Sequence, residues 1–139
     1  MVSTSVPVEE FTTPDPITAN EDMTIDDLRN LMDKHGIRHL PVVRDDTVVG
    51  VISDRDVRIV SGLPIAEKHQ VRVADIMAVD PLTVVATTPL DEVAYAMSEK
   101  KIGSVIVNDE DGQFLGIFTA SDALNALIEI VRGGGTPAA

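Results

Sequence analysis

The sequence lacks cysteine and tryptophan, and only 3% of its residues are aromatic. Without cysteine the chain has no disulfide, no thiolate metal site and no cysteine nucleophile. Because aromatic rings are scarce, the core must be built from aliphatic side chains. That composition favours strands of β-branched residues covered by aliphatic helices. The lack of cysteine is also typical of a reducing compartment, so we expect a cytoplasmic protein.

Basic residues are also few, with 11 Lys and Arg against 23 Asp and Glu, which gives a formal net charge of −12. Such a chain repels nucleic-acid backbones and anionic membrane surfaces unless its basic residues cluster, and the sequence shows no such cluster. No apolar run approaches ~20 residues, and the first ten residues do not have the pattern of a signal peptide. We therefore expect neither nucleic acid nor a membrane as a partner.

The sequence does contain an internal repeat, because its second half matches its first at a nearly constant spacing. The matching pairs include Asp15/Asp80, Met32/Met97, Val42/Val107, Gly50/Gly116 and Asp56/Asp122. We predict a first repeat at 1–66, a second repeat at 67–132 and a flexible tail at 133–139. The tail is expected from its Gly-rich composition.

Each repeat has the pattern of a β-α-β-β-α unit, so the fold class is α+β. The first repeat predicts an extended segment at 17–19, a helix from the N-cap Thr24 to Gly36, strands at 39–43 and 47–53, and a helix at 54–61. The second predicts a segment at 83–85, a helix opened by Pro89, strands at 104–108 and 113–119, and a helix at 120–131. One copy alone has a marginal core. We expect the two to pack sheet to sheet with pseudo-twofold symmetry, leaving two equivalent clefts for ligands.

The segments Gly50–Asp56 and Gly116–Asp122 share the form Gly-apolar-apolar-Ser/Thr-x-x-Asp at a predicted strand-to-helix junction. The hydroxyl ends the strand and the carboxylate lies in the first helical turn, so both can face one concave edge. A carboxylate there can accept hydrogen bonds from a ribose diol, while the hydroxyl and the helix N-terminus suit a phosphate. Such charge-assisted bonds contribute roughly 1.5–3 kcal/mol each. The same pattern is also a variant capping box that needs no ligand, and the motif alone leaves both interpretations open.

The tandem units resemble the CBS domain pair, named after cystathionine β-synthase and also called a Bateman module, over nearly the whole chain. The resemblance is carried by three segments of the first repeat: Asp15–Thr18, Ile37–Val43 and Gly50–Asp56. The second repeat departs from the pattern at one position, where Ile106 replaces the usual proline.

The resemblance implies that adenosyl ligands bind between the copies: AMP, ADP or ATP, with S-adenosylmethionine as a further candidate. It assigns ribose and phosphate to the hydroxyl and carboxylate of the motif, which are Ser53 and Asp56 in one repeat and Thr119 and Asp122 in the other. The residues before the proline position would line the ligand: Ile37, Arg38 and His39, and Ile102, Gly103 and Ser104. The apolar residue before the hydroxyl would pack on the base, which gives Ile52 and Phe118.

The basic residues near these positions are unevenly distributed between the repeats. Four basic residues, Arg38, His39, Arg55 and Arg58, lie in or beside the first repeat's segments, where the second has Gly103, Ser104 and Ser121 at matching places. Since local cations dominate over distant charge within a Debye length of ~8 Å, we expect the site with these cations to bind phosphate more tightly. Arg55 and Arg58 could equally belong to a solvated helix face, and His39 could be a satisfied polar group at a sheet edge. The three scattered histidines do not form a metal site.

The leading hypothesis is therefore a non-enzymatic regulatory module that senses adenine nucleotides and acts by changing shape or by binding a regulated protein partner. The alternative is a ligand-free module that serves assembly. No catalytic cofactor is expected. The family's pairs commonly dimerise through their helices, and the first helix offers an apolar stripe of Ile25, Leu28, Leu31 and Met32 that is wider than one interface needs. We therefore expect a homodimer.

Overall fold

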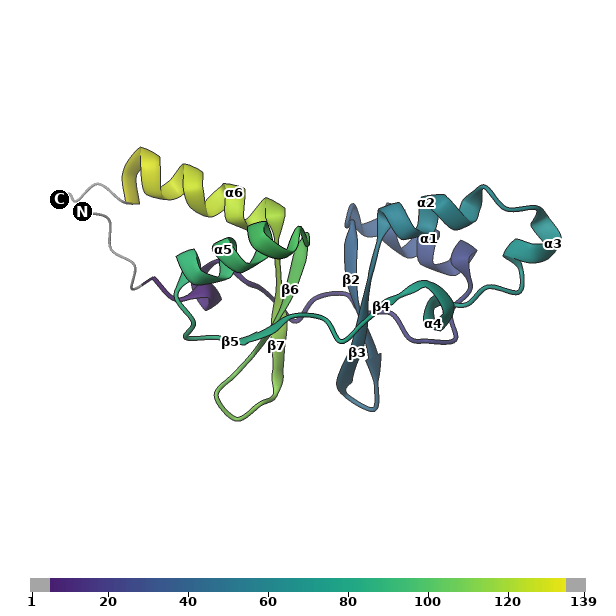
Figure 1. Cartoon of the computed structure of the whole chain (residues 1–139), viewed down its shortest axis with the longest axis horizontal. Coiled ribbons are helices and arrows are strands. Elements are labelled where there is room, and N and C mark those ends of the chain that lie inside the picture. Colours follow the sequence, from purple (N-terminus) through teal and green to yellow (C-terminus); the bar gives the residue numbers. More distant parts are fainter. Residues whose placement is uncertain (1–5, 135–139) are drawn as a thin grey trace. The chain divides into compact units, whose positions relative to one another are not determined.

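The computed structural model describes residues 6–134, which form two compact units with mixed α and β structure (Figure 1). The first-repeat unit is Pro16–Pro81, and the second-repeat unit combines the described residues before Pro16 with those after Pro81. The α+β class expected from the sequence is confirmed. The predicted repeat boundary between 66 and 67 stays a prediction about the duplicated segment. From residue 135 onward the predicted tail lies outside the described residues.

The first-repeat unit has a three-stranded antiparallel sheet of order β2-β3-β4. Its elements are α1 (Ile25–His35), β2 (His39–Arg44), β3 (Thr47–Ser53), α2 (Asp54–Ser61), α3 (Ile65–Lys68), α4 (Val73–Ile76) and β4 (Ala78–Val79). The segment expected to be extended at 17–19 forms only an isolated parallel bridge, between Ala19 and Val42.

The second-repeat unit has a four-stranded sheet of order β1-β7-β6-β5. Its elements are the 3-10 helix η1 (Val8–Phe11), β1 (Thr13–Pro14), β5 (Thr83–Val85), α5 (Leu90–Lys100), β6 (Ser104–Asn108), β7 (Phe114–Thr119), α6 (Ala120–Glu129) and the π-helical turn η2 (Ile130–Gly134). Strands β5 and β6 pair in parallel, and the other pairs are antiparallel.

The edge strands β1 and β4 each belong to one repeat in the sequence but pair with a strand of the other. Strand β1 lies near the start of the first repeat and pairs with β7, and β4 lies near the start of the second repeat and pairs with β3. Glycine makes this close approach possible, because a Cβ at Gly116 would collide with the Thr13 carbonyl oxygen. A Cβ at Gly50 would lie 2.8 Å from the Ala78 carbonyl oxygen. The pairing of each edge strand therefore depends on the first residue of a Gly-apolar-apolar-Ser/Thr-x-x-Asp segment, Gly116 for β1 and Gly50 for β4.

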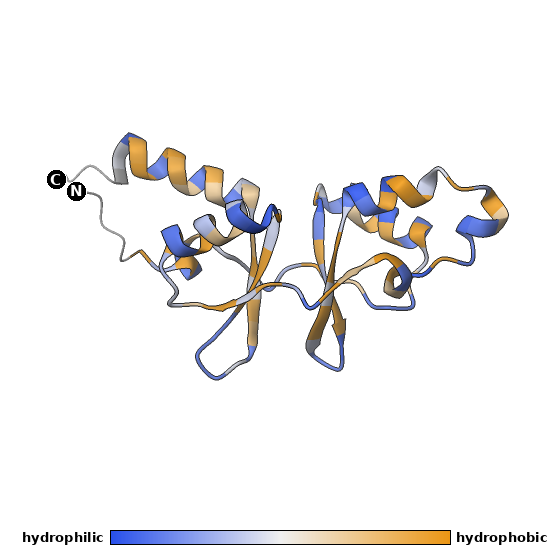
Figure 2. Ribbon diagram, viewed as in Figure 1, coloured by the Kyte–Doolittle hydropathy of each residue, from blue (hydrophilic) through white to orange (hydrophobic). Residues whose placement is uncertain are grey.

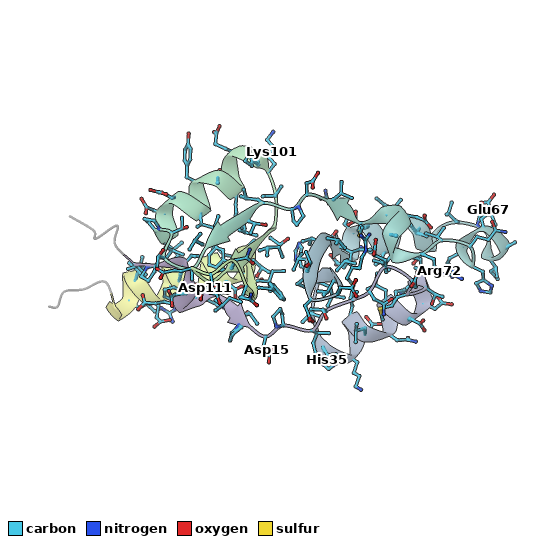
Figure 3. All side chains as sticks on the ribbon, turned by 90° about the horizontal axis from the view of Figure 1, so that it is seen from below. Asp15, His35, Glu67, Arg72, Lys101 and Asp111 are labelled. Carbon is cyan, nitrogen blue, oxygen red and sulfur yellow. The ribbon has the colours of Figure 1, made fainter. Side chains whose placement is uncertain are left out.

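Local signals fix the ends of α1 and α5, and thereby the residues that follow them. The Thr24 side chain accepts a hydrogen bond from the Asp27 N–H at 3.1 Å, as expected for an N-cap. The C-cap of α1 is Gly36, with a φ of 63°, and the C-cap of α5 is Lys101, with a φ of 55°. Figure 3 labels His35, the last residue of α1, and Lys101. The chain therefore leaves both helices by the same left-handed turn.

Each unit has its own aliphatic core between the sheet and the helices, as the apolar strands in Figure 2 indicate. The apolar stripe of α1 belongs to this core, because Ile25, Leu28 and Met32 are buried and Leu31 packs against them. The sequence-based expectation that this stripe exceeds the needs of one interface is therefore wrong. An exposed apolar row runs instead along α6 into η2 and comprises Leu124, Leu127, Ile128 and Val131.

Among the described residues, no helix has both the length and the apolar character that a membrane crossing requires.

Candidate functional site

The predicted hydroxyl–carboxylate pair of the first repeat forms at the junction of β3 and α2. Ser53 is the N-cap of α2, and Asp56 Oδ2 accepts hydrogen bonds from the Ser53 N–H at 3.0 Å and from the Ser53 hydroxyl at 2.9 Å. In return, the Asp56 N–H donates to Ser53 Oγ at 3.3 Å. Within residues 6–134, no donor is recorded for Asp56 Oδ1. The cap thus uses one carboxylate oxygen and leaves the other available.

The second repeat builds the same junction between β7 and α6. Asp122 Oδ2 accepts from the Thr119 N–H at 2.9 Å and from its hydroxyl at 3.1 Å. Here Oδ1 has a further neighbour, the Thr13 hydroxyl of β1, at 3.5 Å. The matching residue of β4 is Ala78, which has no hydroxyl. The two carboxylates therefore differ in the oxygen that the cap does not use.

Both interpretations of the motif are compatible with this geometry. The capping box that we considered as the alternative is present in both repeats. A ligand contact would use Oδ1, whereas the cap uses Oδ2, so one carboxylate can serve both purposes. The cap also fixes the carboxylate rotamer, which lowers the entropy cost of a contact made by the remaining oxygen.

The residues between α1 and β2 lie beside this junction. The Ile37 N–H donates to the Met32 carbonyl at 3.1 Å, and the Arg38 carbonyl accepts the Asp54 N–H at 2.9 Å. His39 pairs with Ser53 across β2 and β3. The structure therefore brings Arg38 and His39 to the same end of the sheet as Ser53, from positions well separated in the sequence.

The second repeat repeats this framework without the cations. The Ala120 N–H donates to the Gly103 carbonyl at 3.0 Å, the Ile102 N–H donates to the Met97 carbonyl at 3.1 Å, and Ser104 pairs with Thr119. The backbone is equivalent in the two units, but the side chains beside the junction carry positive charge only in the first.

Three predicted ligand residues have environments that bear on their roles. Ile52 and Phe118 are fully buried, at 0% exposure, within the cores of their units. Packing on an adenine base would require exposed surface, so the structure gives that role no support. Arg55 is exposed on α2. Its contact with phosphate stays a prediction.

Burial lowers the pKa of the half-buried His39 below its usual value of 6.5. The nearby carboxylates of Asp54 and Asp56 oppose this shift, and the Arg38 guanidinium adds to it. The neutral imidazole is therefore favoured in the folded protein near neutral pH.

This shift predicts a pH dependence of stability. Between 6.5 and the lowered folded pKa, the unfolded chain binds more protons at His39 than the folded chain does, so the free energy of unfolding falls as the pH falls through this window. Denaturant unfolding at about pH 8 and about pH 5 should show a smaller acid loss for His39→Gln than for the wild type. Equal losses would mean that His39 is as easily protonated in the folded chain as in the unfolded one.

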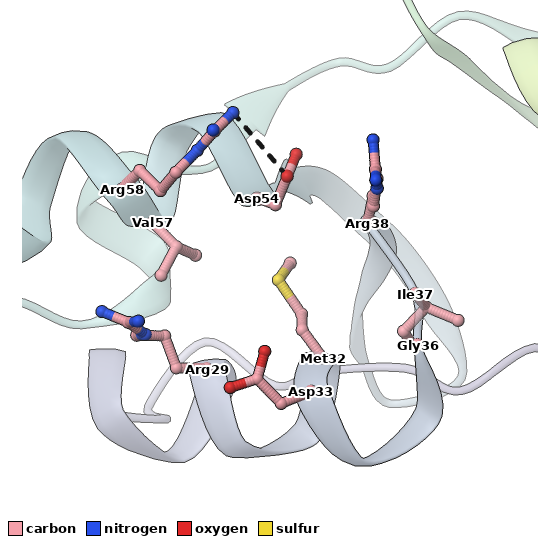
Figure 4. A pocket seen from close by; sticks show the side chains of 9 residues that line it. All are labelled: Arg29, Met32, Asp33, Gly36, Ile37, Arg38, Asp54, Val57 and Arg58. Atoms are coloured by element: carbon pink, nitrogen blue, oxygen red, sulfur yellow. Dashed lines mark ion pairs between the residues drawn. The ribbon is translucent and has the colours of Figure 1, made fainter.

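A pocket that the sequence did not predict lies between α1 and α2 of the first-repeat unit and has a volume of about 370 Å³ (Figure 4). Its lining combines three arginines, two aspartates and an apolar part: Arg29, Arg38, Arg58, Asp33, Asp54, Met32 and Val57. Arg29 and Asp33 come from a helix that the sequence assigned only to packing. The sequence signal for the pocket was that Arg29 and Asp33 are charged, whereas the matching residues of the second repeat are uncharged.

Among the described residues, no group of three or more His, Asp or Glu side chains is placed to hold a metal ion.

The chain is similar in sequence and in structure to known proteins of one family. The sequence profile of the CBS domain matches residues 8–62 and 73–129. An inosine-5'-monophosphate dehydrogenase of Korarchaeum cryptofilum is 35% identical over 114 residues, which cover 82% of this chain but only 23% of that enzyme.

Two solved structures have the same fold over nearly their whole length. CBSX2, a CBS-pair protein from Arabidopsis thaliana solved in complex with AMP, is 30% identical with a TM-score of 0.78, and the match covers 91% of this chain and 98% of CBSX2. The CBS domain of a bacterial CNNM/CorC family Mg2+ transporter, solved in complex with ATP, is 25% identical with a TM-score of 0.81, and the match covers 90% and 89% of the two chains. The duplicated sequence, the two capped strand-to-helix junctions and these matches together establish that the chain belongs to the CBS domain family and contains two copies of the domain.

Proposed function

We propose that this chain is a regulatory module that binds an adenine nucleotide, AMP, ADP or ATP, and catalyses no reaction of its own. The observation that carries the proposal is the Ser53–Asp56 pair, in which the cap orients the carboxylate and leaves Oδ1 without a recorded donor. A ribose diol supplies the hydrogen-bond donors that such an oxygen accepts. Arg38 lies beside the pair and supplies positive charge for a phosphate, and the neutral imidazole of His39 can donate a hydrogen bond there.

The related structures support the ligand class. CBSX2 and the transporter's CBS domain were each solved with an adenine nucleotide, AMP in one and ATP in the other. The likeness to the dehydrogenase concerns less than a quarter of that enzyme, so its activity is not carried over to this chain. A role in regulation, through a shape change or a protein partner, is the part of the proposal that rests on the family alone.

The two repeats should differ in affinity. In the first, Asp56 Oδ1 has no recorded donor among the described residues, and Arg38 lies nearby. In the second, Thr13 already approaches Asp122 Oδ1, and Gly103 replaces the arginine. We propose that the first repeat provides the tighter site, with Ser53 and Asp56 on the ribose and Arg38 and His39 near the phosphate.

Isothermal titration of the purified chain with AMP, ATP and S-adenosylmethionine tests this proposal. At least one of the adenine nucleotides should bind at or below millimolar concentration, and native mass spectrometry of the freshly purified protein should show the stoichiometry. If no adenosyl ligand binds or shifts the melting temperature, the proposal fails and the ligand-free assembly module takes its place.

We also propose that the chain forms a homodimer in the cytoplasm. Support for dimerisation comes from the exposed apolar row of α6, in which Leu124 and Leu127 are 61% and 57% exposed. A row of this kind costs solubility unless another surface covers it. Light scattering should give a mass near twice the 14.9 kDa of one chain, and a mass of one chain at all concentrations would contradict this proposal.

A further inference from the structure

The pocket between α1 and α2 contains an excess of positive charge in a strongly acidic chain. Three guanidinium groups line it, those of Arg29, Arg38 and Arg58, against the two carboxylates of Asp33 and Asp54. The chain as a whole carries −12. Because side-chain charges act over about a Debye length, this local surplus decides which ligands enter.

We propose that this pocket binds the phosphate chain of the nucleotide, so that the first repeat prefers a nucleoside di- or triphosphate to a monophosphate. This inference rests on the proposed function, because the adenosine part is held at Ser53 and Asp56. The new elements are the pocket itself, Arg29 as a phosphate ligand that acts together with Arg58, and the preference for more than one phosphate.

Arg29 is held beside the pocket by a side-chain hydrogen bond to α2. Its Nη1 donates to the Ser61 hydroxyl at 3.2 Å, and that hydroxyl in turn donates to the Val57 carbonyl at 2.9 Å. This chain of bonds links Arg29 to α2 and, among the described residues, uses one of the five guanidinium N–H donors. The remaining donors can contact phosphate oxygens with little additional loss of side-chain entropy.

Arg58 can be recruited by an anion because its present partner holds it weakly. It pairs with Asp54 at 3.7 Å within one helix, as the dashed line in Figure 4 shows, and its side chain is 72% exposed. Exposed ion pairs of this kind contribute little to stability. A phosphate carries more negative charge and more acceptor oxygens than a single carboxylate, so it can replace Asp54 as the partner.

Arg38 connects the pocket to the ribose site. Its carbonyl oxygen accepts the Asp54 N–H, so its backbone is fixed beside the start of α2, and its side chain lines the pocket. Asp54 follows Ser53 directly, which puts the pocket wall next to the hydroxyl of the motif. A nucleotide whose ribose lies on Ser53 and Asp56 therefore has a path for its phosphates into the pocket.

The second repeat offers a built-in comparison, because none of the five charged positions is charged there. The residues that match Arg29, Asp33, Arg38, Asp54 and Arg58 are Ala94, Ser98, Gly103, Ala120 and Leu124. The backbone framework is nevertheless the same in both units. The preference for additional phosphates should therefore belong to the first repeat alone.

The test is isothermal titration of AMP, ADP and ATP in magnesium-free buffer, using chains in which Asp122→Asn weakens the second site. We expect ATP to bind about tenfold more tightly than AMP, and Arg29→Gln and Arg58→Gln each to remove roughly five- to tenfold of ATP affinity with little effect on AMP. Asp33→Asn removes a repelling charge and should tighten ATP about threefold. Inorganic tripolyphosphate should compete with ATP.

Lys34→Gln is the matched control, because it removes one positive charge from the same helix outside the pocket. Equal ATP affinity of Arg29→Gln and Lys34→Gln would overturn the inference, as would equal affinities for AMP and ATP in the unmodified first repeat. In both cases AMP still binds and the proposed function stands. If no adenine nucleotide binds at all, it is the proposed function that has failed. Thermal melting of each variant checks that the pocket substitutions leave the unit folded.

Discussion

Asp56→Asn should weaken adenine-nucleotide binding at the first repeat by about 10- to 100-fold without unfolding the unit. The substitution removes the negative charge that strengthens the bonds to a ribose diol, which contribute roughly 1.5–3 kcal/mol each, and about 1.4 kcal/mol corresponds to a tenfold change in Kd. Asparagine retains one acceptor oxygen for the Ser53 N–H, which lies 3.0 Å from the carboxylate, so much of the cap survives. Isothermal titration with AMP measures the change, and circular dichroism checks the helix content.

Two matched variants separate the ligand contact from the cap. Ser53→Thr should bind nearly as the wild type does, because Thr119 fills the same position in the second repeat with the same three hydrogen bonds. Asp122→Asn should affect only the weaker site. If Asp56→Asn bound AMP with wild-type affinity, the carboxylate would serve the cap alone and the motif would have no part in ligand recognition.

The elements nearest the motif could be predicted from the sequence because their signals are local. Thr24 caps α1 and Gly36 ends it, and the strand-to-helix junctions at Ser53 and Thr119 lie where the sequence places them. In each case a single side chain or a glycine in the left-handed region decides the geometry within one turn. Because the sequence is duplicated, elements predicted in one repeat could also be predicted at the matching positions of the other.

The edge strands β1 and β4 could not be predicted in the same way. Each has two residues, which is too short for any periodicity, and each pairs with a strand of the other repeat. Their only signal was indirect, since a glycine in mid-strand marks a close backbone approach. Gly50 and Gly116 therefore indicated a neighbour without identifying it.

The pocket and the α1 stripe illustrate a second limit. Helical periodicity places Ile25, Leu28 and Met32 on one face, but it does not say whether that face meets its own sheet or another molecule. Arg29 and Arg58 are far apart in the sequence, and only the packing of α1 on α2 puts both on one pocket. The sequence does show that these positions are charged in the first repeat and uncharged in the second. That difference points to a pocket only when the packing of α1 on α2 is known.

Divergence between the two copies also explains how one framework can give two unequal sites. The position of Arg58 in the first repeat is Leu124 in the second, where it begins the exposed apolar row of α6. The same helix face is therefore used for charge in one unit and for apolar surface in the other. Ligand binding and assembly would then be divided between the repeats.

Phe118→Ala should lower the free energy of unfolding by about 3–5 kcal/mol, because it leaves a cavity in the core of the second-repeat unit. Phe118 is fully buried there and packs with Val93, Val105 and Val107. Typical domains are stable by only about 5–15 kcal/mol, so this loss is a large share of the total. Urea unfolding followed by circular dichroism measures it. Because the variant loses a large share of its stability, its nucleotide affinity is not informative by itself.

Phe118→Leu decides whether the side chain has a second role on the base. Leucine keeps most of the apolar volume, so the loss of stability should be nearer 1 kcal/mol and the unit should stay folded. If Phe118 belongs only to the core, where it has no exposed surface, AMP affinity at the second site should then be unchanged. A folded Phe118→Leu variant with tenfold weaker AMP binding at that site would show that the ring reaches the base, and that the core of this unit opens when the ligand binds.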